Sequence, residues 1–250
     1  MDQLLVFMHI PKTAGISFLK IILKQYSLNE IGFCYYQDLE KIQGEMKAIS
    51  NNPNIKYCCG HFLFSIHEQI TRPYTFFTML REPVDRVLSF YYYCRSNPYH
   101  PFHKEILKMS LEEFIITAKV IPHIANFQTW ALSGEYPLSQ DSVDKAKENV
   151  HQYFSLLGIT EMFNESLFLM KEKFGWENIF YTKENITKRP SEPIDNNTID
   201  LIKEINKYDI ELYEWAKSQL QQTIYNLPLL YKVQLNQFIN KQNIRNISSE

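Results

Sequence analysis

The sequence predicts an α/β domain of three layers, in which a central parallel β-sheet is flanked by helices. The chain has 250 residues, 45% of them hydrophobic, which is enough to build one large core. Short runs of strand-forming residues alternate along it with segments of helical periodicity. The first run, Leu4–Ile10, is almost entirely apolar, as is typical of a strand buried on both faces of a parallel sheet.

A loop and a helix are expected directly after that first strand. Gly15 lies in the loop, and Ser17 is the expected N-cap because apolar residues follow it at helical spacing. These apolar residues are Phe18, Leu19, Ile22 and Leu23. The chain therefore opens with a strand–loop–helix unit.

Two further strands are predicted at Ile55–His61 and Tyr74–Leu80. Residues 27–55 are polar with scattered apolar positions, and we predict a turn there at 51–54. Pro83 suits the first turn of a helix, and apolar residues follow it with helical period.

The C-terminal half of the chain continues the alternation. We predict helices near 110–119, 123–133, 141–152 and 166–174, strands at 154–160 and 179–182, loops at 96–104 and 183–197, and an amphipathic helix over 195–220. We assign residues 1–232 to one domain and 233–250 to a polar C-terminal tail, which we expect to be partly disordered.

Composition excludes several classes of function. The formal net charge is −2, so no basic field is available for nucleic acid. The 4 cysteines have neither metal-ligand spacing nor the pattern of a disulfide framework, which favours a reducing, cytoplasmic location. The run Leu4–Ile10 is too short to span a bilayer, so we expect no integral membrane segment. No pattern predicts an oligomeric state.

The loop after the first strand has the chemistry of an anion site. Backbone N–H groups at a helix N-terminus attract phosphate, and Gly15 allows close approach. Lys12 adds a positive charge, and Thr13 and Ser17 add hydroxyl groups. The lysine precedes the glycine, unlike the order G-x-x-x-x-G-K-[ST] of ordinary P-loop enzymes. A plain strand–helix turn with a surface lysine fits this loop equally well.

A second candidate site lies after the strand Tyr74–Leu80. Arg81 follows that strand, and Ser89 falls in the second turn of the helix that begins at Pro83. A planar guanidinium is suited to bidentate binding of phosphate. For Arg81 alone, an ion pair with Glu82 or Asp85 is the competing interpretation.

Three segments together resemble the sulfotransferase family, in the branch that includes the heparan sulfate 2-O- and 6-O-sulfotransferases. They are the loop Pro11–Ser17, the segment Met79–Tyr91 and the sequence Gly60-His61-Phe62. The resemblance implies a P-loop-like sulfotransferase fold and the donor 3′-phosphoadenosine 5′-phosphosulfate, PAPS. The family has Thr or Ser where this chain has Ile16, which leaves that position only its backbone N–H.

The resemblance also implies roles for individual residues. His61 is the implied general base, and an imidazole is suited to removing a hydroxyl proton near neutral pH. We favour it over His67 and over the pair His100 and His103. Lys12 is the second catalytic residue, at the oxygen that leaves. The implied donor-binding residues are Pro11, Lys12, Thr13, Ala14, Gly15, Ile16, Ser17, Arg81, Ser89, Lys188 and Arg189.

Some of these assignments have strong competitors. The loop that contains Lys188 and Arg189 is just as well explained as a solvated loop. Residues 126–134 resemble the family's segment around the active-site helix. Aromatic residues could line an acceptor groove, but most are equally suited to a core; they are Phe90, Tyr91, Tyr92, Tyr93, Tyr99, Phe102 and Trp130.

The sequence thus predicts PAPS-dependent transfer of a sulfuryl group to a hydroxyl, with no metal ion. The acceptor implied is a carbohydrate or glycoconjugate, or another small molecule with a hydroxyl group. Two alternatives stay open: a P-loop nucleotide or small-molecule kinase, and a non-catalytic glycan-binding module on the same fold.

Overall fold

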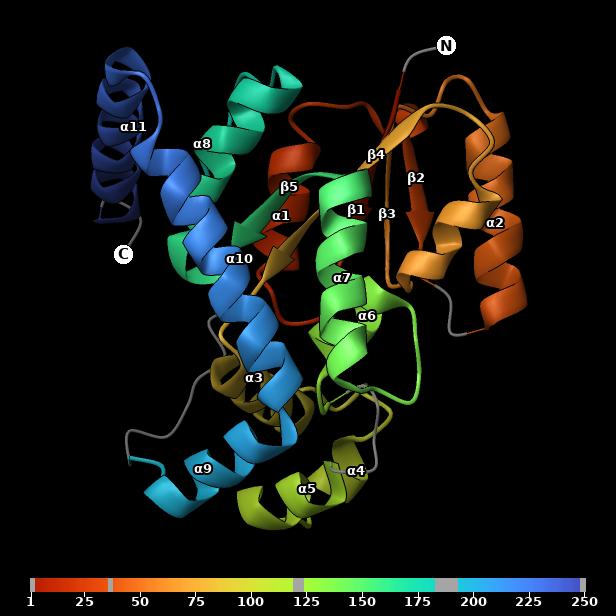
Figure 1. Cartoon of the computed structure of the whole chain (residues 1–250), viewed down its shortest axis with the longest axis vertical. Coiled ribbons are helices and arrows are strands. Elements are labelled where there is room, and N and C mark those ends of the chain that lie inside the picture. Colours follow the sequence, from red (N-terminus) through yellow and green to blue (C-terminus); the bar gives the residue numbers. More distant parts are fainter. Residues whose placement is uncertain (1–2, 36–37, 119–123, 183–192, 248–250) are drawn as a thin grey trace.

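The computed structural model describes residues 3–35, 38–118, 124–182 and 193–247. Within them, five parallel strands form one sheet in the order β2-β3-β1-β4-β5, with helices on both faces (Figure 1). The predicted three-layer α/β fold is confirmed.

All pairings in the sheet are parallel, so every strand ends at the same edge. We call this the carboxyl edge. The strands are β1 Leu4–Met8, β2 Ile31–Cys34, β3 Tyr57–Gly60, β4 Tyr74–Leu80 and β5 Phe154–Ile159. β1 is the middle strand, and all of its residues are buried, as the apolar run predicted.

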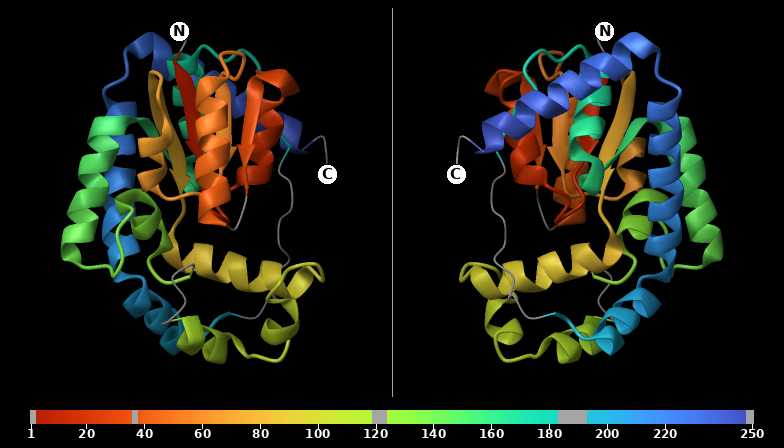
Figure 2. Two further views of the ribbon diagram at one scale, coloured as in Figure 1. Left: turned by 90° about the vertical axis from the view of Figure 1, so that its right-hand side faces the viewer. Right: turned by 90° about the vertical axis from the view of Figure 1, so that its left-hand side faces the viewer.

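Helices cover both faces of this sheet and its carboxyl edge. The helices are α1 Gly15–Ile22, α2 Leu39–Asn51, α3 Pro83–Ser96, α4 His103–Ile106, α5 Leu111–Ala118, α6 Phe127–Ser133, α7 Gln140–Tyr153, α8 Phe163–Phe174, α9 Asn196–Ile205, α10 Lys207–Tyr225 and α11 Leu229–Ile247. Three short 3₁₀ turns lie at Leu28–Glu30, Phe64–Gln69 and Thr160–Met162. α3 crosses beneath the carboxyl edge, with α4, α5 and α9 below it (Figure 2).

Side chains of β1 alternate between two cores. Val6 and Met8 join a cluster with α2, α6, α7 and α10, whereas Leu5 and Phe7 join a cluster with α1, α8 and α11. A third cluster joins α3, α4, α5 and α9 below the carboxyl edge. Each face of the sheet therefore has its own apolar layer, and the edge between them carries the polar residues.

The structure differs from the sequence predictions in the segments of weakest periodicity. Residues 27–55 contain β2 and α2, because scattered apolar residues such as Ile42 and Met46 fall on one buried helical face. In the described part of the predicted tail, α11 buries Leu235 and Phe238 against the α1–α8 face.

Two further elements also differ from prediction. The single helix over 195–220 is split into α9 and α10 by Asn206, a buried residue whose Oδ1 accepts from the Asn126 N–H at 3.0 Å. Residues 179–182 form no strand. Instead, the Gln242 side chain bonds to both the N–H and the carbonyl of Tyr181, at 3.1 and 2.7 Å.

A buried carboxylate on α10 ties the C-terminal half to the sheet edge. Asp209 accepts hydrogen bonds from the backbone N–H groups of Gln128 and Thr129 at 3.1 and 2.7 Å, and from the Thr129 hydroxyl at 2.8 Å. Burial raises its pKa, while nearby Arg86, itself 1% exposed, acts to lower it. Asp209 therefore satisfies the N-terminal donors of α6.

Replacing this carboxylate will destabilise the fold. Asp209→Ala leaves the α6 donors unsatisfied and the Arg86 charge uncompensated, so we expect the free energy of unfolding to fall by about 3–5 kcal/mol. Urea unfolding measures the change. Asp200→Ala is the matched control, because Asp200 lies exposed on α9, and it should change stability by less than about 0.5 kcal/mol. Equal effects of the two substitutions would contradict the assignment.

Candidate functional site

The candidate site is built from the residues that directly follow the strands. Tyr35 follows β2, His61 follows β3, His9 follows β1 and Arg81 follows β4. The order of the strands places them along the carboxyl edge in that same sequence. Ligands of open parallel sheets bind beyond this edge, so the position makes these residues a candidate binding site.

The loop between β1 and α1 has an unusual backbone. Lys12 and Ala14 both have positive φ angles, 73° and 65°, although neither is glycine. Ala14 is the N-cap of α1 and offers no side-chain hydrogen bond. The first N–H groups of α1 are thus left for another partner, and non-glycine residues in this region cluster at ligand sites.

Thr13 and Ser17 both differ from the sequence prediction in their local structure. The Thr13 side chain is fully buried, and its hydroxyl donates to the Ile10 carbonyl at 2.7 Å. That hydroxyl stabilises the loop, and the predicted contact of Thr13 with a ligand stays a prediction. Ser17 is the third residue of α1, not its N-cap, because α1 begins at Gly15. Both hydroxyl groups are buried in this structure.

The other loop residues keep a backbone role. Pro11 is half-buried, and the Ile16 side chain is 49% exposed at the second position of α1. Gly15 is required by packing, because a Cβ there would lie 1.9 Å from Nε2 of His9. The loop thus packs at Gly15 directly against the ring of His9.

Lys12 carries a charge that no carboxylate in the described part of the chain neutralises. Its Nζ lies 3.8 Å from the centroid of the Tyr93 ring, and no described carboxylate forms an ion pair with it. Burial, and secondarily the charge of Arg81, lower its pKa to about 8. A buried lysine beside another cation is stabilised by an anionic ligand.

Arg81 is held firmly at the end of β4. Its Nη1 donates to the Lys12 carbonyl at 3.1 Å, and its Nη2 lies 3.7 Å from the Asp85 carboxylate. Gln128 pairs with its backbone on both sides, accepting from the N–H and donating to the carbonyl at 2.9 Å each. The predicted ion pair with Asp85 therefore coexists with a position beside Lys12.

Ser89 lies on α3, which Pro83 begins as predicted. It is 5% exposed and is the seventh residue of the helix, so it falls at the end of the second turn. Lys188 and Arg189 lie outside the described residues, and their predicted contacts stay predictions.

The histidine at the end of β3 differs from the alternatives. His61 places its Nε2 3.2 Å from Nδ1 of His9, and burial lowers its pKa to about 4. By contrast, His67 and His103 each place Nδ1 2.8 Å from a backbone carbonyl, those of Phe64 and Cys94. Of these three histidines, His61 is the one that directly follows a strand at the carboxyl edge, where it lies beside His9.

A family model described as the sulfotransferase family matches residues 1–216. The chain belongs to the sulfotransferase family. A chicken (Gallus gallus) protein, heparan-sulfate 6-O-sulfotransferase 2, is 24% identical over 275 residues, covering 86% of this chain and 66% of the relative. Zebrafish (Danio rerio) heparan-sulfate 6-O-sulfotransferase 2 is 23% identical, covering 86% and 58%.

Two further proteins are similar to this chain, one over a shorter segment and one at lower identity. Zebrafish heparan-sulfate 6-O-sulfotransferase 1-B is 32% identical over 85 residues, covering 34% of this chain and 21% of the relative. The solved structure of mouse sulfotransferase SULT7A1 complexed with PAP has a TM-score of 0.42 and 15% identity, covering 84% of this chain and 66% of that one. This family member spans less than two thirds of the length of its curated relatives.

Two residues of the candidate site, His9 and Tyr35, had no role in the sequence prediction. His9 precedes the loop, and its place at the end of an apolar strand was the available signal. Tyr35 gave no signal, because β2 itself was not predicted. Tyr93, one of the aromatic candidates for an acceptor groove, lies under Lys12 instead.

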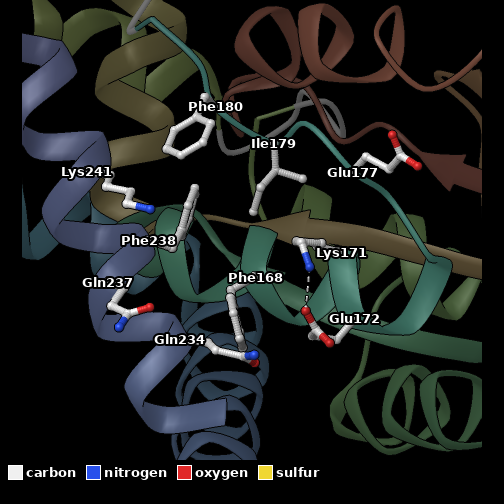
Figure 3. Close-up of a pocket in the computed structure, with 10 residues that line it drawn as sticks. All are labelled: Phe168, Lys171, Glu172, Glu177, Ile179, Phe180, Gln234, Gln237, Phe238 and Lys241. Atoms are coloured by element: carbon white, nitrogen blue, oxygen red, sulfur yellow. Dashed lines mark hydrogen bonds and ion pairs between the residues drawn. The ribbon is translucent and has the colours of Figure 1, made fainter. Parts of the chain in front are cut away.

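Two pockets lie elsewhere on the molecule. One of about 220 Å³ separates α8 from α11, and Figure 3 shows Phe168, Lys171, Phe238 and Lys241 around it. Another of about 500 Å³ lies where the strands begin, beside Thr75. Neither includes a residue of the candidate site.

The site histidines will make stability depend on pH. Burial, the charge of Lys12 and neighbouring His61 lower the pKa of His9 to about 3, so both histidines are neutral in the folded protein. The unfolded chain takes up these protons as pH falls below about 6.5, so stability is lost from there towards pH 4.

Urea unfolding between pH 7.5 and 5 measures this slope. His9→Asn removes one of the two groups, so its slope should be shallower than that of the wild type. His151→Asn is the control, because His151 is exposed and should leave the slope unchanged. A His9→Asn slope equal to that of the wild type would contradict the burial of a neutral His9.

Proposed function

We propose that this chain transfers the sulfuryl group of PAPS to a hydroxyl of a carbohydrate acceptor. The observation behind this proposal is the set of groups at one edge of the sheet. They are a Lys12 with no described carboxylate partner, an α1 N-terminus whose N-cap Ala14 makes no side-chain hydrogen bond, Arg81 and a neutral His61. The names of the matched relatives, heparan-sulfate 6-O-sulfotransferases, support the acceptor class.

The donor site in this proposal has two anion-binding halves. Lys12 and the N–H groups of α1 hold the 5′-phosphosulfate, where the helix dipole and the lysine charge add. Arg81 and Ser89 hold the 3′-phosphate. Arg81 suits this role because Gln128 fixes its backbone while its guanidinium lies beside the loop.

The proposed reaction is an in-line displacement. His61 removes the proton of the acceptor hydroxyl, and its neutral state near pH 7 leaves a free lone pair. Lys12 and the backbone N–H groups stabilise the negative charge that develops on the leaving phosphate oxygen. One such donor aimed at developing charge contributes about 3 kcal/mol. Lys12 and these N–H groups stabilise that charge, and no step is assigned to a metal ion.

A cytoplasmic location remains part of the proposal. All four cysteines are free and buried, which fits a reducing compartment. In the described part of the chain, no helix has the length and apolar character needed to cross a membrane.

Two other functions compete with this proposal. A P-loop kinase would need Mg²⁺ and ATP, and the position of Lys12 before Gly15 counts against it. A non-catalytic glycan-binding module would bind acceptor without turnover, and Ile16 is the feature that favours it, because its exposed apolar side chain replaces a hydroxyl.

The donor site predicts binding of adenosine 3′,5′-bisphosphate. Lys12→Ala and Arg81→Ala should each weaken this binding by about 10- to 150-fold, the value of a hydrogen bond to a charged group. Isothermal titration calorimetry measures the dissociation constants. Lys41→Ala, on the exposed side of α2, is the matched control and should bind as the wild type does. Absence of binding to folded wild type would overturn the proposal.

Turnover separates the three functions. With PAPS and heparan-type oligosaccharides, we expect sulfated product without Mg²⁺, and His61→Ala should reduce the rate by about 10²- to 10⁴-fold while still binding the bisphosphate. Mass spectrometry of products from PAPS and from ATP with Mg²⁺ identifies the group transferred. Phosphorylated product would favour the kinase, and glycan binding without product would favour the module.

A further inference from the structure

Three side chains at the carboxyl edge form one contact cluster. Nδ1 of His9 lies 3.2 Å from Nε2 of His61 and 3.0 Å from the hydroxyl of Tyr35. The ring centroids are 4.7 Å apart for His9 and His61, 4.7 Å for Tyr35 and His61, and 5.8 Å for His9 and Tyr35. His61, the base of the proposed reaction, therefore contacts two polar side chains, His9 and Tyr35, to which that reaction assigns no role.

A general base needs a partner that fixes its orientation and its tautomer. A carboxylate commonly takes this place, but no described carboxylate forms an ion pair with His61, and burial is the cause of its lowered pKa. The polar atom that reaches His61 Nε2 is Nδ1 of His9. A second imidazole thus occupies the partner's position.

His9 cannot easily turn away from this contact. Its ring stacks on Phe7, with centroids 5.7 Å apart and planes 13° from parallel. Its other nitrogen, Nε2, lies against Gly15 so closely that a Cβ would collide with it. The ring is therefore wedged between the core and the loop, with Nδ1 directed at His61.

The Tyr35 hydroxyl lies within hydrogen-bond distance of Nδ1 of His9 and is able to donate to it. Burial raises the pKa of the Tyr35 hydroxyl, so it keeps its proton and can donate to Nδ1 of His9. An Nδ1 that accepts from Tyr35 carries no proton, and it then faces the Nε2–H of His61 as an acceptor. Both hydrogen bonds use the same lone pair of His9.

We propose that His9 is the positioning residue of the base: its Nδ1 accepts from both Tyr35 and the Nε2–H of His61, which leaves Nδ1 of His61 as the basic nitrogen. This inference rests on the proposed function. The proton of the acceptor hydroxyl moves to His61 Nδ1 as the new sulfur–oxygen bond forms and the bond from sulfur to the leaving phosphate oxygen breaks. His61 becomes a cation, and its Nε2–H bond to His9 strengthens.

The same ring links the two halves of the site. One edge of the His9 ring packs against the donor loop at Gly15, and the other edge contacts the base, His61. A displaced loop would therefore displace His61 through a single rigid group.

Substitutions at His9 test the positioning role. His9→Phe keeps an aromatic ring but removes Nδ1, so kcat should fall by about 10- to 150-fold, the value of one hydrogen bond to a charged group. His9→Asn places an amide oxygen near the lost Nδ1 and should recover most of that loss. The dissociation constant of adenosine 3′,5′-bisphosphate, measured for both variants, separates an effect on the donor loop through the Gly15 contact from the loss of kcat that the positioning role predicts.

Tyr35→Phe is the second test variant. We expect a smaller loss of kcat than in His9→Phe, because His61 keeps its contact with His9. Tyr225→Phe, on an exposed face of α10, is the matched control and should have wild-type activity. A His9→Phe variant that binds the bisphosphate and has wild-type kcat would overturn the inference. So would equal losses of kcat in His9→Phe and His9→Asn.

The wild-type protein provides an independent readout. Two-bond ¹⁵N–¹H NMR spectra of the imidazoles should show His61 protonated on Nε2 and His9 unprotonated on Nδ1 at pH 7. The opposite pair of tautomers would overturn the inference even if a variant failed to fold. Failure of the proposed function looks different, because wild type would then neither bind the bisphosphate nor turn over PAPS, while the tautomers could be as predicted.

Discussion

Strand β1 pairs in parallel with β3 on one side and with β4 on the other, and this register positions the whole candidate site. Met8 is level with Gly60 across one pairing, so His9 and His61 emerge side by side. On the other side Met8 is level with Thr78, and β4 continues to Leu80. Arg81 therefore emerges two residues further out, about 7 Å at the usual rise per residue, where the extended loop reaches it.

The loop itself stores strain that the surrounding structure compensates. Two non-glycine residues with left-handed backbone, Lys12 and Ala14, cost roughly 1–2 kcal/mol each. The Thr13 hydroxyl and the Arg81 guanidinium hold the loop by its carbonyl groups at Ile10 and Lys12. Both of these hydrogen bonds use carbonyl groups of the loop, so neither occupies an N–H group that could bind an anion. The left-handed backbone of Lys12 and Ala14 is thus both the source of the strain and part of the candidate anion site.

A chain of polar contacts connects this site to the C-terminal half of the molecule. Asp209 on α10 caps α6, and Gln128 on α6 holds the backbone of Arg81. Burying a carboxylate is costly, but its three hydrogen-bond donors offset that cost and fix α6 in one position. The long C-terminal helices therefore contribute to the placement of a residue at the end of β4.

The sequence by itself determined the strand–loop–helix opening, the helix that begins at Pro83 and the candidates Lys12, Arg81, Ser89 and His61, because local periodicity and short motifs encode them. β2, α2 and α11 were missed, since their apolar residues are sparse and acquire meaning only when a neighbouring surface buries them. The burial of the Thr13 hydroxyl and the contact of His9 with His61 and Gly15 were decided by tertiary structure alone. These contacts join residues far apart in the chain, and their geometry depends on the register of the sheet.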